Sequence, residues 1–267
     1  MANAILERGL DRAAHDRPGQ DRPGWAAPTT SGDGGGGFTS AEPTMRYGGV
    51  GSATAALLAL VVAAGVFGWA SVESVAPGES VALPGWLIVV LLGAFGTAIL
   101  TSFKPNLARV TAPIYAVLEG LVLGAISKVY ENQFDGIVVQ AVGLTVLVFA
   151  SMLFLYSTRI LKVTDKFRRV VVGATLGLMA FYAVSMLLAL FDVQAPLIWD
   201  SGPIGIGFSF LVAGLAAFNL ALDFDLAERG VRDGLPQRYE WFCAFALVTS
   251  LVWLYLELLR LLSKLRD

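Results

Sequence analysis

Seven apolar segments, each of about 20 residues, follow one another along most of the chain. They cover approximately residues 50–71, 84–103, 110–130, 137–157, 169–191, 203–223 and 240–262. A helix rises about 1.5 Å per residue, so about 20 apolar residues cross the ~30 Å hydrocarbon core of a bilayer. Open strands cannot do this, because their backbone groups would stay unpaired in lipid. The pattern predicts an all-α, polytopic membrane protein, a bundle of seven transmembrane helices.

The composition supports a membrane protein. Hydrophobic residues make up 56% of the chain and charged residues only 15%, which is too apolar for a soluble domain of this size. The single cysteine, Cys243, cannot form an internal disulfide, and we expect it to be a small buried hydrophobe. The only histidine, His15, precedes the apolar segments, which excludes a histidine-based metal site among them. The pair Gly120 and Gly124 has the spacing that lets two helices pack closely.

The chain divides into two parts. Residues 1–46 are polar and rich in glycine and proline, which predicts a disordered tail with at most a short helix around residues 3–14. No apolar core follows the early charges, so this is no signal peptide. The glycine run ending at Gly37 lacks a following Gly-Lys-Ser/Thr and is better interpreted as a linker than as a phosphate loop. Residues 47–267 form the predicted seven-helix transmembrane domain.

The basic residues predict the orientation. Most of the 19 Lys and Arg residues lie in the tail and in the loops after segments two, four and six. Cytoplasmic loops are enriched in Lys and Arg, so we expect a multi-pass protein of the cell (plasma) membrane with a cytoplasmic N-terminus. Three residues near the C-terminus, Arg260, Lys264 and Arg266, oppose this rule. Either the last segment crosses and holds them near the interface, or it bends back as a partial span.

Acidic residues at membrane depth are the candidate functional residues. Asp223 closes the sixth segment, at or just inside a membrane face, and Asn219 lies one helical turn before it on the same side. A carboxylate there must find a partner, face protein or water, or take up a proton. The candidates for a cation pathway or pH sensor are Asp223, Glu119, Glu257, Glu240, Asn219, Asp225 and Ser250, and the candidate counter-charges are Lys104 and Arg109.

Most of these residues also have a structural interpretation. Glu119, near the centre of the third segment, is either a protonated acid bonded across helices or functional. Glu257 has the spacing of an i,i+3 ion pair with Arg260. Asp225 points away from Asp223 and could be solvated surface. A short connection could bring Glu240 to Asp223, where the two carboxylates would be ligands for Ca²⁺. Lys104 and Arg109 either pair with Asp223 or anchor the helix ends.

Three segments resemble a known family. They are Pro113–Gly124, Leu222–Glu228 and Trp253–Leu262, and together they are similar to the Bax inhibitor/YccA family of seven-helix membrane proteins, in particular its bacterial branch. The resemblance implies a passive Ca²⁺ leak whose pH response comes from two acids on the sixth and seventh helices and a basic residue of the second. Asp223 matches the sixth-helix acid and Lys104 the basic residue. The seventh-helix position is Ser250 in one register and Glu257 in another.

Two functions remain open at this point. The first is a pH-modulated passive Ca²⁺ leak, in which two carboxyls in one low-dielectric site share a proton whose loss parts the sixth and seventh helices. The alternative is a non-conducting regulator of a membrane-bound ATP-dependent protease or another membrane protein, which it would contact through the N-terminal tail. An enzyme is not expected, because the usual intramembrane protease motifs are missing. The lipid bilayer is the expected surrounding, and we expect no nucleic acid partner and no cofactor.

Overall fold

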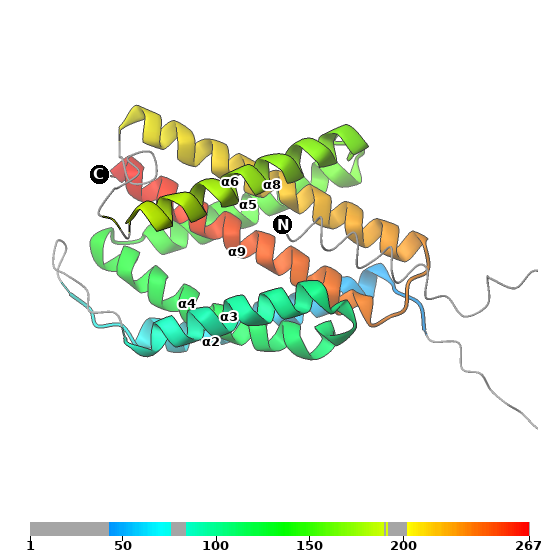
Figure 1. Cartoon of the computed structure of the whole chain (residues 1–267), viewed down its shortest axis with the longest axis horizontal. Helices are drawn as coiled ribbons and strands as arrows, with labels where there is room; N and C mark the ends of the chain where they lie inside the picture. Colours follow the sequence, from blue (N-terminus) through cyan, green and yellow to red (C-terminus); the bar gives the residue numbers. More distant parts are fainter. Residues whose placement is uncertain (1–42, 76–83, 190, 192–201, 267) are drawn as a thin grey trace, which may run out of the picture.

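The computed structural model describes residues 43–75, 84–189, 191 and 202–266, and the short helix expected within residues 3–14 lies outside them. This part of the chain contains seven helices long and apolar enough to cross a membrane (Figure 1). They are α2 (Tyr47–Ala70), α3 (Trp86–Phe103), α4 (Ala108–Gln133), α5 (Ile137–Ser157), α6 (Asp165–Ala189), α8 (Pro203–Arg232) and α9 (Tyr239–Arg266), with the 3-10 turn η1 (Pro105–Leu107) before α4. The predicted seven-helix, all-α membrane fold is confirmed.

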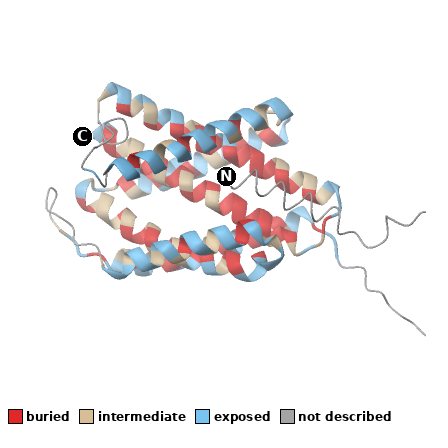
Figure 2. Ribbon diagram, viewed as in Figure 1, coloured by how far each residue is buried: buried red, intermediate tan, exposed pale blue. Residues whose placement is uncertain are grey.

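The last helix, α9, forms the centre of the bundle. Its most apolar stretch is 83% buried, whereas the corresponding stretch of α3 is only 17% buried. Helices α2, α3 and α4 lie on one side of α9, and α5, α6 and α8 lie on the other (Figure 1). Buried residues accordingly run along α9 between the two groups (Figure 2). A helix that is apolar on every face is typically one that others surround, and α9 has this pattern.

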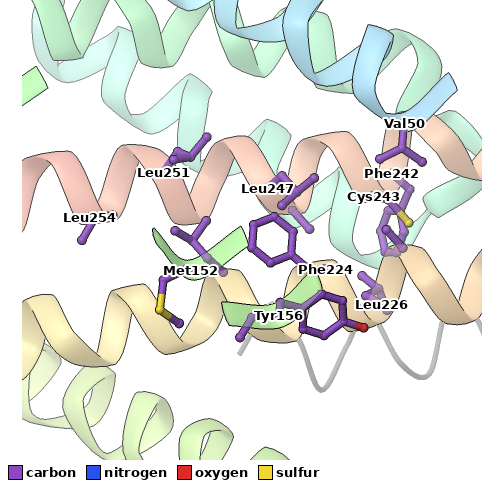
Figure 3. Packing of buried hydrophobic residues seen from close by; sticks show 14 of the residues in the cluster. Val50, Met152, Tyr156, Phe224, Leu226, Phe242, Cys243, Leu247, Leu251 and Leu254 are labelled. Carbon is purple, nitrogen blue, oxygen red and sulfur yellow. The ribbon is translucent and has the colours of Figure 1, made fainter. Parts of the chain in front are cut away.

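Large side chains fill the space between α5, α8 and α9. Phe224 of α8 packs against Phe149 and Tyr156 of α5, with ring centroids 5.7 Å apart in both pairs. Figure 3 shows this packing, with Leu247 of α9 on the other side of Phe224. Cys243 is fully buried in the same cluster, as expected of a small hydrophobe. The core therefore fixes α5, α8 and α9 relative to one another.

Glycines let α4 approach α2 closely. A Cβ added to Gly124 would overlap the backbone oxygen of Gly65, and one added to Gly120 would overlap that of Val61. Backbones can come this near only where no side chain intervenes. The packing role predicted for the Gly120–Gly124 pair is confirmed.

The sixth spanning helix is longer than the sequence indicated. We expected it to close at residue 223, but α8 continues to Arg232, about 14 Å further. The reason is that Leu226, Ala227 and Gly230 are still buried beyond the first acidic residues, so packing maintains the helix. Asp223 therefore lies well inside a helix rather than at its end.

The bundle begins slightly earlier than residue 47. Met45 is almost fully buried and its backbone amide donates a 2.7 Å hydrogen bond to Leu235 in the turn between α8 and α9. Gln237 in turn donates to the carbonyl of Pro43 at 2.8 Å. Residues 43–46, which we expected to belong to the disordered tail, thus pair with this turn. We call this end of the bundle the tail side and the opposite end the far side.

The last helix runs the whole length of the bundle. At its end, Lys264 donates to the carbonyl of Gly205 at the start of α8, and Arg266 donates to the carbonyl of Asp135 between α4 and α5. Both acceptors lie on the far side. Of the two alternatives for the seventh segment, a full crossing is therefore correct, and its basic residues make hydrogen bonds there.

Candidate functional site

Asp223 is buried in the contact between α8 and α9. Its side chain is 1% exposed, and its Oδ2 atom has no hydrogen-bond partner among the described residues. The Ser250 hydroxyl of α9 is the hydrogen-bonding group beside the carboxyl. A buried polar atom without a partner is rare in a folded protein, and it marks a place where a proton or another ligand could be bound.

The α8–α9 register brings a serine, and not a second acid, to Asp223. Glu257 lies two helical turns beyond Ser250 on α9, about 10 Å further along the helix. Of the two registers left open by the sequence, the structure therefore selects the one that places Ser250 opposite Asp223. The site holds one carboxyl and one hydroxyl from these two helices.

A second polar pair lies one turn from Asp223. The buried Asn219 donates hydrogen bonds to the hydroxyl of Thr175 on α6, at 3.0 Å, and to the carbonyl of Leu215, at 2.9 Å. The predicted polar stripe of Asn219 and Asp223 on the buried face of α8 is present. Thr175 was not predicted, because a single threonine in an apolar helix carries no sequence signal of its own.

Glu240 occupies a different place from the one expected. Its Oε1 atom accepts a 2.9 Å hydrogen bond from the backbone amide of Arg46, and its carboxylate lies against Gly49 in the first turn of α2. A negative charge at a helix N-terminus is favourable, so this carboxylate fastens the start of α2. Within the described residues, no group of three or more His, Cys, Asp or Glu could hold a metal ion.

The two expected counter-charges do not reach Asp223. Lys104 and Arg109 are exposed and form no ion pair within the described part of the chain. For Lys104 the physical reason is the position of α3, which packs against α4 and η1 rather than against α8. Arg109 lies in the first turn of α4 and is also exposed, so the expectation that the two residues neutralise Asp223 was wrong.

Asp225 belongs to an ion-pair network on the tail side. Its carboxylate lies 2.7 Å from Arg168 of α6 and 2.9 Å from Arg229 of its own helix. Next to it, Glu228 binds Arg159 and the hydroxyl of Tyr156. The hydrogen bond from Arg159 to this carboxylate raises the pKa of the guanidinium above its ordinary value. These contacts connect the α5–α6 connection to α8, which gives Asp225 a structural partner instead of a free surface position.

Glu257 forms the predicted ion pair with Arg260. The Nη1 atom of Arg260 lies 2.9 Å from Oε1 of Glu257, and Tyr182 of α6 donates to the same oxygen at 3.3 Å. Arg260 also donates to the Tyr182 hydroxyl at 3.1 Å. Tyr182 was not predicted, because which helix would face α9 at this level could not be read from the sequence.

Glu119 lies on the other side of α9 from Asp223. It is partly buried on α4, one turn after Tyr115, whose ring packs edge-on against Phe245 of α9 at 5.0 Å. Within the described residues it makes no hydrogen bond or ion pair. Of the seven candidate residues, Asp223, Ser250 and Asn219 lie together, whereas Glu240 binds at the start of α2 and Asp225 and Glu257 lie in separate ion pairs.

The comparison with known proteins identifies a family. A family model described as Bax inhibitor 1 like matches residues 3–267, which is nearly the whole chain. No curated protein matches the chain, and no solved structure does. The chain belongs to the Bax inhibitor 1 like family.

Proposed function

We propose that the protein is a passive cation leak, for Ca²⁺, whose conduction is controlled by the protonation of Asp223. The observation that carries the proposal is the buried Oδ2 atom of Asp223, which no described residue satisfies. The family and the seven spanning helices supply the setting. The membrane is the plasma membrane and the tail side is cytoplasmic, because most basic residues outside the spans lie on that side.

The control follows from the charge of one carboxyl. An ionised carboxylate held away from water must gain a positive partner, and Lys104 and Arg109 do not supply one. When Asp223 is protonated, the site carries no charge and does not attract a cation. When Asp223 loses its proton, the negative charge attracts a cation to the α8–α9 contact. Conduction should therefore increase as the pH rises.

The part of the α8–α9 contact between Asp223 and the far side favours a closed state of the pathway. Polar side chains of α9 recur about every 10 Å, at Ser250, Glu257 and Lys264. Between Asp223 and the far side, however, lie Arg260, whose guanidinium is paired with Glu257, and Lys264, whose ammonium repels a cation. Opening would require Arg260 to move with Glu257 out of this contact. The described residues contain no group of three or more acidic, His or Cys side chains that could hold a metal ion, which favours weak, transient ion binding over tight binding.

Flux through liposomes tests the proposal. Protein reconstituted with an internal Ca²⁺ dye should show an influx that rises as the pH is raised, because a higher pH favours the ionised carboxyl. Asp223→Asn should remove the pH response. Asp225→Asn is the matched control, since Asp225 lies in an ion pair two positions away and should leave the response in place. Identical flux from the wild type and Asp223→Asn at every pH would refute the proposal.

A second candidate is a regulator that acts by contact. The observation that favours it is the pairing of residues 43–46 with the α8–α9 turn, which gives the tail a fixed point of attachment beside the helix that carries Asp223. A partner such as a membrane-bound protease could then be bound through the tail. Deleting residues 1–40 should abolish recovery of such a partner in a detergent pull-down, whereas the leak predicts that Ca²⁺ flux is unchanged by the deletion.

A further inference from the structure

A cavity of about 590 Å³ lies between α2 and α5. Its walls are α2, from Leu58 to Trp69, and α5, from Val138 to Phe149. Its floor is formed by α4 and α9, which contribute Ser127 and Tyr255 among others. The volume falls within the range of about 300–1,000 Å³ that is typical of small-molecule sites. We call it the α2–α5 cleft.

The cleft has the length of one leaflet of a bilayer. Each wall covers about 16 Å of helix, which is half of the ~30 Å hydrocarbon core. Trp69 lies next to the last residue of α2, so the cleft begins at the far-side interface, where tryptophans tend to lie. Leu58 is near the middle of α2, and the cleft therefore ends near the bilayer centre.

The lining offers almost no polar groups to an occupant. The hydroxyls of Ser127 and Tyr255 are 2.6 Å apart and satisfy each other. Thr145 donates to the carbonyl of Ala141 at 2.7 Å, within its own helix. The remaining lining side chains are apolar, apart from the indole of Trp69. Water needs two or more polar partners to be stable in such a space, so an apolar occupant is favoured.

The cleft opens sideways, toward lipid. Val62 and Val66 on the α2 wall are 66% and 63% exposed, and Val146 on the α5 wall is 60% exposed. These residues both line the cleft and face outward from the bundle, so its mouth lies between the two walls. A molecule in the surrounding leaflet can enter without passing through water.

The cation Lys128 stands at the interfacial end of the cleft. The Nζ atom of Lys128 lies 5.1 Å from the ring centroid of Trp69, and Lys128 forms no ion pair with a described residue. The nearest acid on the same helix, Glu131, accepts hydrogen bonds from the backbone amides of Gly136 and Val138 at the start of α5. The acidic residue Asp135 is exposed, where water and salt screen its charge.

We propose that the α2–α5 cleft binds one acyl chain of an anionic phospholipid from the far-side leaflet, with the lipid phosphate held by Lys128. The length of the cleft and its sideways mouth suit a chain that remains attached to the bilayer. The charge of Lys128 suits a headgroup with a net negative charge. The site is independent of Asp223, and it would act as a lipid wedge that keeps α2 and α5 apart in the far half of the bundle.

Native mass spectrometry of the full-length protein in detergent tests the site, with phosphatidylglycerol and phosphatidylcholine as probes. The wild type should retain one phosphatidylglycerol more tightly than phosphatidylcholine, by about fivefold, the effect typical of one basic residue at a membrane surface. Val142→Trp places an indole inside the cleft and should abolish this retained lipid. Val139→Trp is the matched control, because Val139 is 76% exposed on the same helix and does not line the cleft.

Lys128→Gln provides a second test that does not depend on filling the cleft. It should leave one bound lipid but remove the preference for phosphatidylglycerol. Equal lipid retention by Val142→Trp and Val139→Trp would show that the lipid binds elsewhere on the surface and would overturn the proposal. So would equal binding of the two lipids by the wild type, or a preference that survives in Lys128→Gln. Circular dichroism of each variant confirms that the helices have formed before binding is compared.

Discussion

The carboxylate of Glu240 accepts a hydrogen bond from the backbone amide of Arg46, a residue 194 positions earlier in the chain. This contact joins the first turn of α9 to the residue that precedes α2. The neighbouring Gly49 leaves room for the carboxylate, because any side chain there would overlap it. The central helix and the first spanning helix are thereby fixed to each other at the tail side.

Removing this carboxylate should destabilise the bundle. Glu240→Ala removes the acceptor of the part-buried hydrogen bond from the Arg46 amide, and a hydrogen bond to a charged group contributes about 1.5–3 kcal/mol. We expect the free energy of unfolding in mixed micelles to fall by about 2 kcal/mol. Glu240→Gln keeps an acceptor but loses the charge at the helix start, so its loss should be smaller. An alanine variant as stable as the wild type would contradict this role.

The glycine contact between α4 and α2 predicts a comparable loss of stability. Gly124→Ala would push a methyl group into the backbone oxygen of Gly65, which cannot move aside as a flexible side chain can. Overpacking of this kind costs about 1–3 kcal/mol, and we expect a corresponding drop in thermal stability in detergent. Gly143→Ala on α5 is the control, because nothing lies within 4 Å of the added carbon. If both variants melt at the same temperature, the close approach of α2 and α4 is not as described.

The ion pair between Glu257 and Arg260 predicts a large effect of removing one partner. Glu257 is 3% exposed, so Arg260→Ala should leave an uncompensated buried charge and cost about 3–5 kcal/mol. Unfolding of the single variants and of Arg260→Ala with Glu257→Gln forms a double-mutant cycle. The double variant should be more stable than Arg260→Ala alone, and additive losses would show that the two side chains do not interact.

The features predicted correctly from the sequence are those that depend on neighbouring residues. Seven spans follow from seven apolar segments, the glycine packing from a four-residue spacing, and the Glu257–Arg260 pair from a three-residue spacing on one helix. The burial of Asp223 follows from the apolar residues around it. Each of these is local information, which the sequence contains directly.

The features that were missed depend on which helices meet. Glu240 finds its partner at Arg46 and not at Asp223, because residues 43–46 fold back onto the α8–α9 turn. Lys104 misses Asp223 because α3 packs against α4. The length of α8 was underestimated because buried contacts beyond Asp223 continue the helix through charged residues. No pattern within a single segment carries this information.

The serine opposite Asp223 gives the sharpest prediction about function. Ser250→Asp would place a second carboxyl beside the first. Two carboxylates neutralise the charge of a divalent ion more completely than one does. The ratio of Ca²⁺ to Na⁺ flux in liposomes should rise by about tenfold, the effect of about 1.4 kcal/mol in relative binding. The pH response should also broaden, since two interacting acids lose their protons in two separate steps. Ser250→Asn, which adds similar bulk without charge, should change neither quantity, and equal selectivity of the two variants would remove Asp223 and Ser250 from the ion pathway.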